Sequence, residues 1–462
     1  MKQQLHPWLS IALVACMIVP SVQADGPWEI PFSQIPFPHL VPPSAYGVVV
    51  DAYRAGTEEQ PRIILIQDMH GHVGAQRNIA QVLYHLVPKL SRAANHPIPL
   101  YVEGAWTSVD PSPIRNIPEA KLREITANYL LNKTEFTGSD YFAVMHPEFA
   151  NLFEIRRAEE RDLYLTQMEV LQRSLPNHQA LVKRIQLAES SLHGLRNQNY
   201  PLALRRLYKL RQAYQNGKID PARYAASLIT LARIHHINLQ PYRFMHQALA
   251  SGKIPEASAE LVILNREFSH LHYALAHTLV QQKPLWAYLP FDDFHTQVLL
   301  NNMVIIDQYL DLLKQLVSEP LPREDTGAAY RLLPQLAQVA QRLMGADTAT
   351  PELSEVLRAS LDFYPLSVLR DDPLIRNTLV GAQEGPAILV AGGFHAQGMV
   401  NTLRKQGVSY LIIAPVIDRP MTSDEQMNYV KRTAGDYLTA DEVERDFVQP
   451  ATQNQEPIRP PS

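Results

Sequence analysis

The sequence predicts an α/β fold in which a parallel-rich sheet is built from two β-α-β units, one near each end of the chain. Short apolar runs rich in β-branched residues lie at 63–67 (IILIQ) and 387–391 (AILVA). Such runs are typical of strands that are buried on both faces of a parallel sheet. The sequence between the two units carries helical periodicity instead, which predicts a large helical insertion.

The first unit spans residues 63–102. The run at 63–67 is followed by a helical pattern that ends near Pro88, and a second apolar run, IPLYV, occupies 98–102. The apolar residues of the helix recur at the spacing of one helix face, and they are Ile79, Val82, Leu83, Leu86 and Val87.

The second unit repeats this layout. The run at 387–391 is followed by a glycine turn, a short helix and a final strand at 409–414. Gly407 fits the position just after the helix, where a left-handed backbone conformation favours glycine. Units of this kind with short connections predict a parallel sheet with right-handed crossovers.

These patterns divide the chain into five segments. We expect a signal peptide at 1–24, the first half of the α/β core at 25–150 and a helical insertion at 151–345. The second half of the core follows at 346–419, and a largely disordered tail at 420–462, where apolar residues become sparse.

The first 24 residues have the layout of an export signal. A positive start at Lys2 precedes an apolar stretch at 9–19, and Val22-Gln23-Ala24 forms a small-residue cleavage site. The sequence LVAC ending at Cys16 also resembles a bacterial lipobox, in which Cys16 would carry a lipid anchor. We therefore expect a periplasmic or secreted protein, or alternatively a membrane-anchored lipoprotein.

Composition excludes two classes of partner. The formal net charge of the 462-residue chain is −4, so no basic field favours nucleic acid or an anionic membrane. Beyond the signal, no apolar stretch approaches the roughly 18 residues of a spanning helix, so we expect no transmembrane segment in the mature chain.

Three chemically active side chains follow strands of the predicted sheet. His70 and Glu103 come shortly after the two runs of the first unit, and His395 follows the first run of the second unit. Ligands of open parallel sheets bind outside the carboxyl ends of the strands, so we expect these side chains to converge there. Imidazole nitrogens and a carboxylate can ligate a divalent ion such as Mn²⁺, Co²⁺ or Zn²⁺.

The same segments resemble the TIKI/TraB proteins, whose superfamily includes erythromycin esterases and ChaN-like haem-binding lipoproteins. The turn 392–395 (GGFH) resembles their second Gly-x-x-His motif, 67–70 (QDMH) their first motif, and 101–104 (YVEG) their strand-two glutamate. The segment 369–371 (LRD) resembles an arginine element shortly before the last motif. The chain departs from the pattern at Gln67, where the family motif has glycine.

The resemblance implies a shared fold and a site at His70, Glu103 and His395, with Asp68 and Arg370 nearby. The superfamily contains metal-dependent proteases, metal-independent esterases and haem carriers, so fold alone does not select an activity.

Each candidate residue also has a structural interpretation. His70 could cap the following helix, Asp68 could orient His70 or cap that helix, and Glu103 could pair with Arg370. Arg370 and Asp371 could form an internal ion pair near a helix start, and Gly392 and Gly393 are turn glycines in either case. We interpret His72 as a solvated loop residue and Glu159 as part of a charged helix face.

Three functions remain open at this stage. The first is an exported hydrolase that acts on an ester or peptide bond of a small molecule or peptide. Either a divalent metal or a histidine acting as general base would activate water. The second is a haem-binding envelope protein. The third is a non-catalytic envelope protein whose helical part binds a partner.

Overall fold

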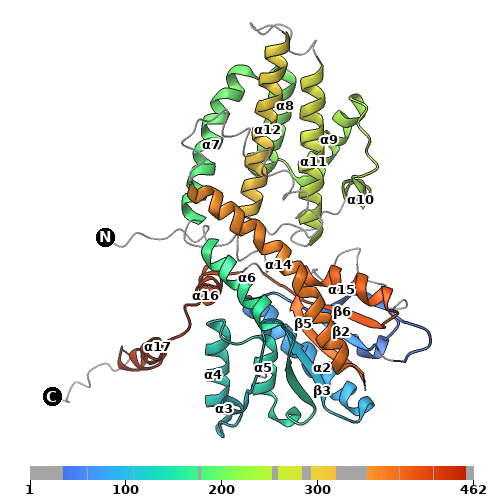
Figure 1. Ribbon diagram of the computed structural model, residues 1–462, viewed down its shortest axis with the longest axis vertical. Coiled ribbons are helices and arrows are strands. Elements are labelled where there is room, and N and C mark those ends of the chain that lie inside the picture. Colours follow the sequence, from blue (N-terminus) through green and yellow to red (C-terminus); the bar gives the residue numbers. More distant parts are fainter. Residues whose placement is uncertain are drawn as a thin grey trace, which may run out of the picture.

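A computed structural model describes residues 35–59, 61–107, 109–174, 178–251, 259–282, 293–318, 351–383, 385–419 and 421–453. The predicted signal peptide, including Cys16, lies outside the described residues. The described chain forms an α/β part and a helical part, which lie at the bottom and the top of Figure 1.

A six-stranded sheet forms the centre of the α/β part, in the order β1-β6-β2-β5-β3-β4. Every neighbouring pair is parallel except β1 and β6, which are antiparallel. The strands are β1 (Gly47–Tyr53), β2 (Ile63–Asp68), β3 (Ile98–Val102), β4 (Phe153–Arg157), β5 (Ala387–Gly392) and β6 (Tyr410–Pro415). The predicted parallel-rich α/β fold is therefore confirmed.

The two predicted units are adjacent in the sheet, and their strands also interleave. Strand β2 of the first unit lies between β5 and β6 of the second, and β5 lies between β2 and β3. This arrangement brings the ends of β2, β3 and β5 next to one another, although the helical part separates them in sequence. The antiparallel edge strand β1 was not predicted.

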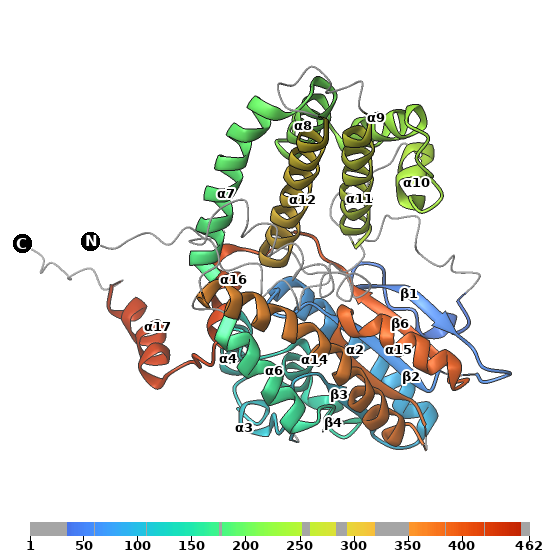
Figure 2. The same ribbon diagram turned by 45° about the horizontal axis from the view of Figure 1, so that its top comes forward.

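Side chains alternate between the two faces of each strand, so the sheet has a core on either side. Ile64 and Ile66 of β2 pack in the core shared with α2 (Val73–Ala94) and α5 (Gly138–Met145). Ile63 and Leu65 pack in the opposite core, which α14 (Pro351–Gly381) and α15 (Gly393–Lys405) cover. Figure 2 shows this layering from a second direction.

Helix α2 is longer than the sequence suggested, because it continues past Pro88 to Ala94. Proline removes one backbone donor from a helix, and here the apolar face of α2 remains buried on both sides of Pro88, with Val87 and Leu90 at 0% exposure. Packing therefore outweighs the local cost. Helices α3 (Ser112–Arg115) and α4 (Ala120–Asn132) pack against α5 on this side of the sheet.

The helical part is built around an apolar core, to which Leu228, Phe268, Leu271 and Leu300 belong and which continues into the α/β part through residues such as Leu171. Its helices are α7 (His178–Asn199), α8 (Leu202–Gln215), α9 (Pro221–Ile234), α10 (Arg243–Ser251), α11 (Ala259–Gln281) and α12 (Asp293–Ser318).

The predicted boundary at residue 151 is wrong. Strand β4 pairs with β3 at the edge of the sheet, and α6 (Arg161–Ser174) packs along α14 of the α/β part. The segment 153–174 therefore belongs to the core. Helix α14 itself runs from the helical part down onto the sheet (Figure 1).

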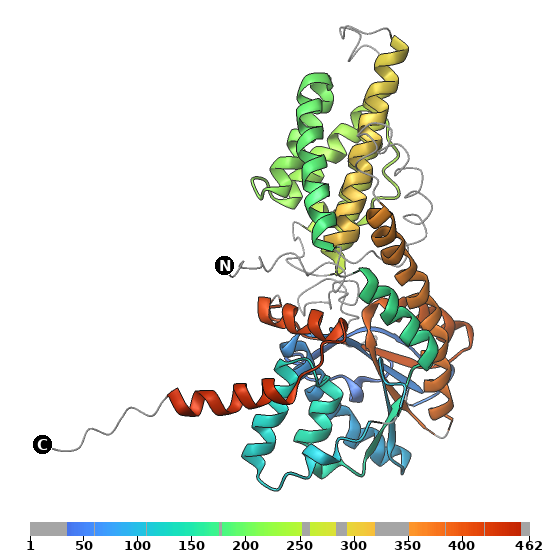
Figure 3. The same cartoon turned by 60° about the vertical axis from the view of Figure 1, so that its left-hand side comes forward.

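The expected disorder after residue 420 is also wrong for most of the described residues there. Helix α16 (Ser423–Thr433) begins with a capping box formed by Thr422 and Glu425, and α17 (Ala440–Gln453) follows it. A capping box satisfies backbone donors at the helix start, which offsets the low apolar content of this segment. Figure 3 shows α16 against the α/β part and α17 projecting from it.

Among the helices that the structure describes, none combines the length and the apolar character needed to span a bilayer.

Candidate functional site

Glu103 lies at the C-terminal edge of the sheet, between β3 and β5. Its backbone N–H donates to the carbonyl of Val390 at 2.9 Å, so the residue continues the pairing of the two strands. The side chain is 5% exposed. Its Oε2 accepts a hydrogen bond from the backbone N–H of Gly392, at the end of β5. The strand ends thus fix this carboxylate on the side where parallel sheets bind ligands.

His70 approaches one oxygen of this carboxylate. Its Nε2 lies 3.4 Å from Glu103 Oε2, and its Nδ1 lies 2.8 Å from Oδ2 of Asp68, the last residue of β2. Gly71, with φ of +74°, turns the chain directly behind His70 into α2. Because a carboxylate faces Nδ1, a neutral His70 carries its proton there and directs Nε2 at Glu103.

His395 approaches the other oxygen in the same manner. Its Nε2 lies 3.3 Å from Glu103 Oε1, and its Nδ1 lies 2.7 Å from Oδ1 of Asp371. The residue stands in the first turn of α15, directly after β5, and its side chain is 4% exposed. Two histidines therefore flank one carboxylate through their Nε2 atoms, and an aspartate contacts the Nδ1 of each ring.

Arg370, which lies in α14, connects Glu103 to residues of α6. Its side chain is 1% exposed, and Nη2 lies 2.8 Å from Glu103 Oε1. The guanidinium also donates to both carboxylate oxygens of Glu159 and to Oε1 of Gln167 in α6. It stands over the ring of Tyr164, 5.2 Å from the centroid. A fully buried guanidinium with two carboxylate partners makes this network sensitive to the loss of any member.

The network shifts the protonation of its members. Burial alone would raise the pKa of Glu103, but His395 and Arg370, with His70, hold it well below its usual value. Burial alone would lower the pKa of His70, yet Asp68 and then Glu103 outweigh it and raise the pKa well above 6.5. The pKa of His395 is raised against burial in the same way, by Glu103 and by its own aspartate. Each histidine therefore keeps its proton to a higher pH than a free imidazole and can act as an acid below its raised pKa and as a base above it.

A cavity of about 10 Å³ lies between these side chains, which is room for roughly one water molecule. Phe363 and Ser367 of α14, with Phe394 of α15, cover it. The side chain of His70 is 16% exposed, so it is the part of the site nearest to solvent. The ring of Tyr429 from α16 stacks beside it with centroids 6.2 Å apart.

The predicted convergence of His70, Glu103 and His395 is confirmed by these distances, and their chemical role stays a prediction. Glu103 does pair with Arg370, as the structural interpretation proposed, while also meeting both histidines. Arg370 and Asp371 do not lie near a helix start, because they stand well inside α14 and bind different partners.

Two sequence interpretations are wrong. His72 is fully buried, and it rather than His70 caps α2, since its Nδ1 accepts from the N–H of Ala75 at 3.1 Å. Its Nε2 lies 2.9 Å from the carbonyl oxygen of Arg419. Glu159 is not on a charged helix face, because it is 3% exposed and binds Arg370.

Sequence reasoning missed three residues that complete the site. Gln167 and Ser367 hydrogen bond to each other above Arg370, and Tyr429 stacks on His70. These side chains come from helices whose apolar periodicity carries no sign of a site. Asp371, in contrast, was named beside Arg370 in the sequence, but its partner is His395 rather than Arg370.

The fit of a metal ion to these residues is mixed. Ring nitrogens oriented by carboxylates are typical of metal-bound histidines. However, Arg370 and the N–H of Gly392 already occupy the oxygens of Glu103, and the guanidinium places a positive charge against it. In the part of the chain that the structure describes, no group of three or more His, Cys, Asp or Glu side chains could hold a metal ion as placed.

Comparisons of this chain with protein-family models, with curated proteins and with solved structures found no match.

Proposed function

We propose that this chain is a hydrolase that cleaves an ester or peptide bond by acid–base chemistry at His70 and His395. One observation carries the proposal: each oxygen of Glu103 faces the Nε2 of one histidine, and an aspartate orients each ring. Such a pair of oriented imidazoles, buried at the ligand-binding edge of a parallel sheet, suits proton transfer.

Hydrolysis needs a base for the attacking water and an acid for the leaving atom. In the proposed reaction the neutral histidine takes a proton from water as the oxygen attacks the carbonyl carbon. The protonated histidine gives a proton to the leaving oxygen or nitrogen. Glu103, held ionised by Arg370, stabilises whichever ring carries the charge. Entry of a substrate requires Phe363 or Phe394 to move, since the cavity has room for about one water.

The raised pKa of both histidines gives this proposal a pH dependence. The neutral, base form of each ring becomes populated only as the pH rises through its raised pKa, which lies above the usual 6.5. Activity should therefore rise from neutral to alkaline pH and fall again once both rings have lost their protons.

The test uses purified full-length protein with p-nitrophenyl acetate, p-nitrophenyl butyrate and a set of fluorogenic peptides. His70→Gln and His395→Gln should each lower kcat at least 100-fold, the lower end of the contribution of general acid–base catalysis. His246→Gln, which changes an exposed histidine of α10, is the matched control and should leave kcat unchanged. Equal rates for all four proteins would refute the hydrolase and favour a binding protein.

Metal-dependent hydrolysis is a second candidate, because one observation favours it. The Nε2-to-oxygen distances of 3.3 and 3.4 Å are long for charged hydrogen bonds. Two ligands at 2.0–2.1 Å from one tetrahedral ion lie roughly this far apart, at about 3.3–3.4 Å. Elemental analysis of protein purified without chelators separates the candidates, since stoichiometric Mn, Co or Zn and inhibition by EDTA would favour the metal.

Haem binding also stays a prediction, although the small volume at the site gives it no support. A titration with haem that produced a Soret band, absent from His70→Gln and His395→Gln, would favour that function over hydrolysis.

A further inference from the structure

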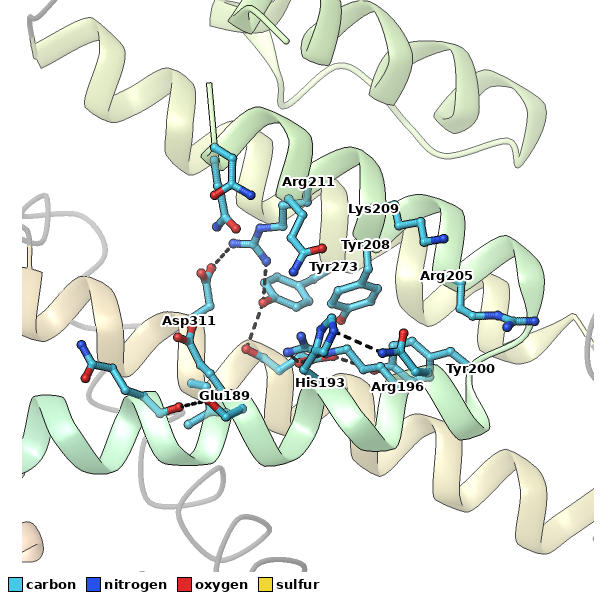
Figure 4. A pocket seen from close by; sticks show the side chains of 18 residues that line it. Glu189, His193, Arg196, Tyr200, Arg205, Tyr208, Lys209, Arg211, Tyr273 and Asp311 are labelled. Carbon is cyan, nitrogen blue, oxygen red and sulfur yellow. Dashed lines mark hydrogen bonds and ion pairs between the residues drawn. The ribbon is translucent and has the colours of Figure 1, made fainter. Parts of the chain in front are cut away.

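A second cavity lies in the helical part, away from the sheet. It has a volume of about 600 Å³ and opens between α7 and α8, with α11 and α12 forming its floor (Figure 4). The volume falls in the range of about 300–1,000 Å³ that is usual for small-molecule sites. None of its lining residues belongs to the site at the strand ends.

Charged side chains, rather than apolar ones, build the deep wall. Arg196 Nε donates to Asp307 Oδ1 at 2.8 Å, and the hydroxyl of Tyr200 donates to the other oxygen at 2.6 Å. Next to this pair, Arg211 donates to Asp311 Oδ2 at 2.5 Å. The Asp307 side chain is only 1% exposed, and buried ion pairs of this kind are costly to desolvate. Apolar residues would form this wall without the desolvation cost of buried charges.

The wall has hydrogen-bond donors to spare. The Nε of Arg205 is buried and has no hydrogen-bond partner, and the buried hydroxyl of Tyr208 lies near Asp307 and Tyr200 without a hydrogen bond of good geometry. Buried polar atoms without partners are rare and call for an explanation such as a missing water, ion or ligand. Burial, followed by the charge of Asp307, raises the pKa of Tyr208 well above 10, so its hydroxyl keeps its proton and remains a donor.

The charge of the lining is positive. Four cationic side chains line the cavity, against the three carboxylates of Glu189, Asp307 and Asp311. The cations are Arg196, Arg205, Lys209 and Arg211. Both oxygens of Asp307 are already occupied, so the wall offers donors and positive charge more readily than acceptors.

We propose that this cavity binds a small organic anion through a phosphate or carboxylate group. The anion would accept hydrogen bonds from Arg205 and Tyr208 and would neutralise the excess positive charge. Charge-assisted hydrogen bonds to guanidinium are among the stronger polar contacts in proteins. Side-chain amides at the rim, such as Asn197, Gln212 and Gln215, would contact the remainder of the molecule.

A neutral sugar is the main competitor for the same volume. Each sugar hydroxyl needs an acceptor as well as a donor, and both oxygens of Asp307 already accept hydrogen bonds from Arg196 and Tyr200. We therefore expect glucose to bind far more weakly than glucose 6-phosphate, which differs from it by the anionic group alone.

The test is isothermal titration of the full-length chain with inorganic phosphate, glucose 6-phosphate, citrate and glucose. At least one of the three anions should bind with a stoichiometry of one. Arg205→Gln should weaken that binding about 10-fold or more, the usual effect of losing a hydrogen bond to a charged group. The control Arg206→Gln removes the same charge from the neighbouring residue, which is exposed and lines a different groove of α8, and should change affinity less than 2-fold.

Tyr208→Phe provides a second variant that removes one donor and keeps the charge, and it too should weaken binding. Binding of citrate without the phosphates would identify a carboxylate ligand, and the reverse a phosphate ester. The proposal is wrong if no anion binds or if glucose binds as tightly as the tightest anion. It is also wrong if Arg205→Gln and Arg206→Gln have the same affinity for that anion.

Discussion

Replacing Arg370 by methionine tests whether the buried charge network holds the α/β part together. The change removes the guanidinium but keeps an unbranched side chain of moderate length inside α14. Two carboxylates, Glu103 and Glu159, then lose their shared cation at 5% and 0% side-chain exposure. Glu103 keeps its two histidines and the N–H of Gly392, whereas the N–H of Gly104 that remains on Glu159 carries no full charge.

The expected loss follows from this burial. Removing one partner of a buried ion pair typically costs about 3–5 kcal/mol, because it leaves a charge uncompensated. The two carboxylates share one cation and can take up a proton, so we do not double this value. For a cooperative unit of 150–250 residues, about 2–4 °C per kcal/mol corresponds to a fall in Tm of roughly 6–20 °C.

The assay is thermal unfolding followed by circular dichroism at pH 7, with Arg376→Met as the matched control. Arg376 lies on the same helix, but its side chain is 57% exposed and its carboxylate partners are exposed as well. That change should therefore alter stability by no more than about 0.5 kcal/mol. Adding Glu159→Gln to Arg370→Met should recover part of the loss, since one uncompensated charge is removed. Equal Tm values for the two single variants would refute the reasoning.

Two further predictions concern stability. Because the folded-state pKa of His70 and His395 is raised, their stabilising contribution is complete below about pH 6.5 and is lost as the pH rises through the raised values. Tm should therefore fall from pH 6 to pH 9, and a Tm that declines as steeply in the double His→Gln variant would contradict this origin. Gly71→Ala should destabilise by about 1–3 kcal/mol, because φ is +74° and a Cβ would lie 2.7 Å from Tyr429 Cβ. The control Gly217→Ala has a similar φ of +65°, and its added Cβ would meet nothing within 4 Å. Urea unfolding should therefore show a smaller loss of stability for Gly217→Ala than for Gly71→Ala. A larger loss for Gly217→Ala would exclude a close contact of Gly71 with α16.

The strands of the sheet could be predicted from the sequence because their patterns are local. Runs such as 63–66 and 387–391 are apolar at every position, which is typical of a strand covered on both faces. Strand β1 escaped prediction because an antiparallel edge strand has a weaker pattern, and its burial declines after Val49. The helix α16 escaped because its capping box and its contacts with the core, rather than its apolar content, stabilise it.

For the site, the sequence by itself determined which side chains stand at strand ends: His70, Glu103 and His395 each follow an apolar run, and the ends of parallel strands share one edge. The partners of these side chains depended on tertiary structure, because strand order is set by pairing between segments hundreds of residues apart. Only that order places β5 between β2 and β3, so that Glu103 receives one histidine on each oxygen. The same packing, not any local pattern, buries Arg370 against Glu159 and decides that His72, rather than His70, caps α2.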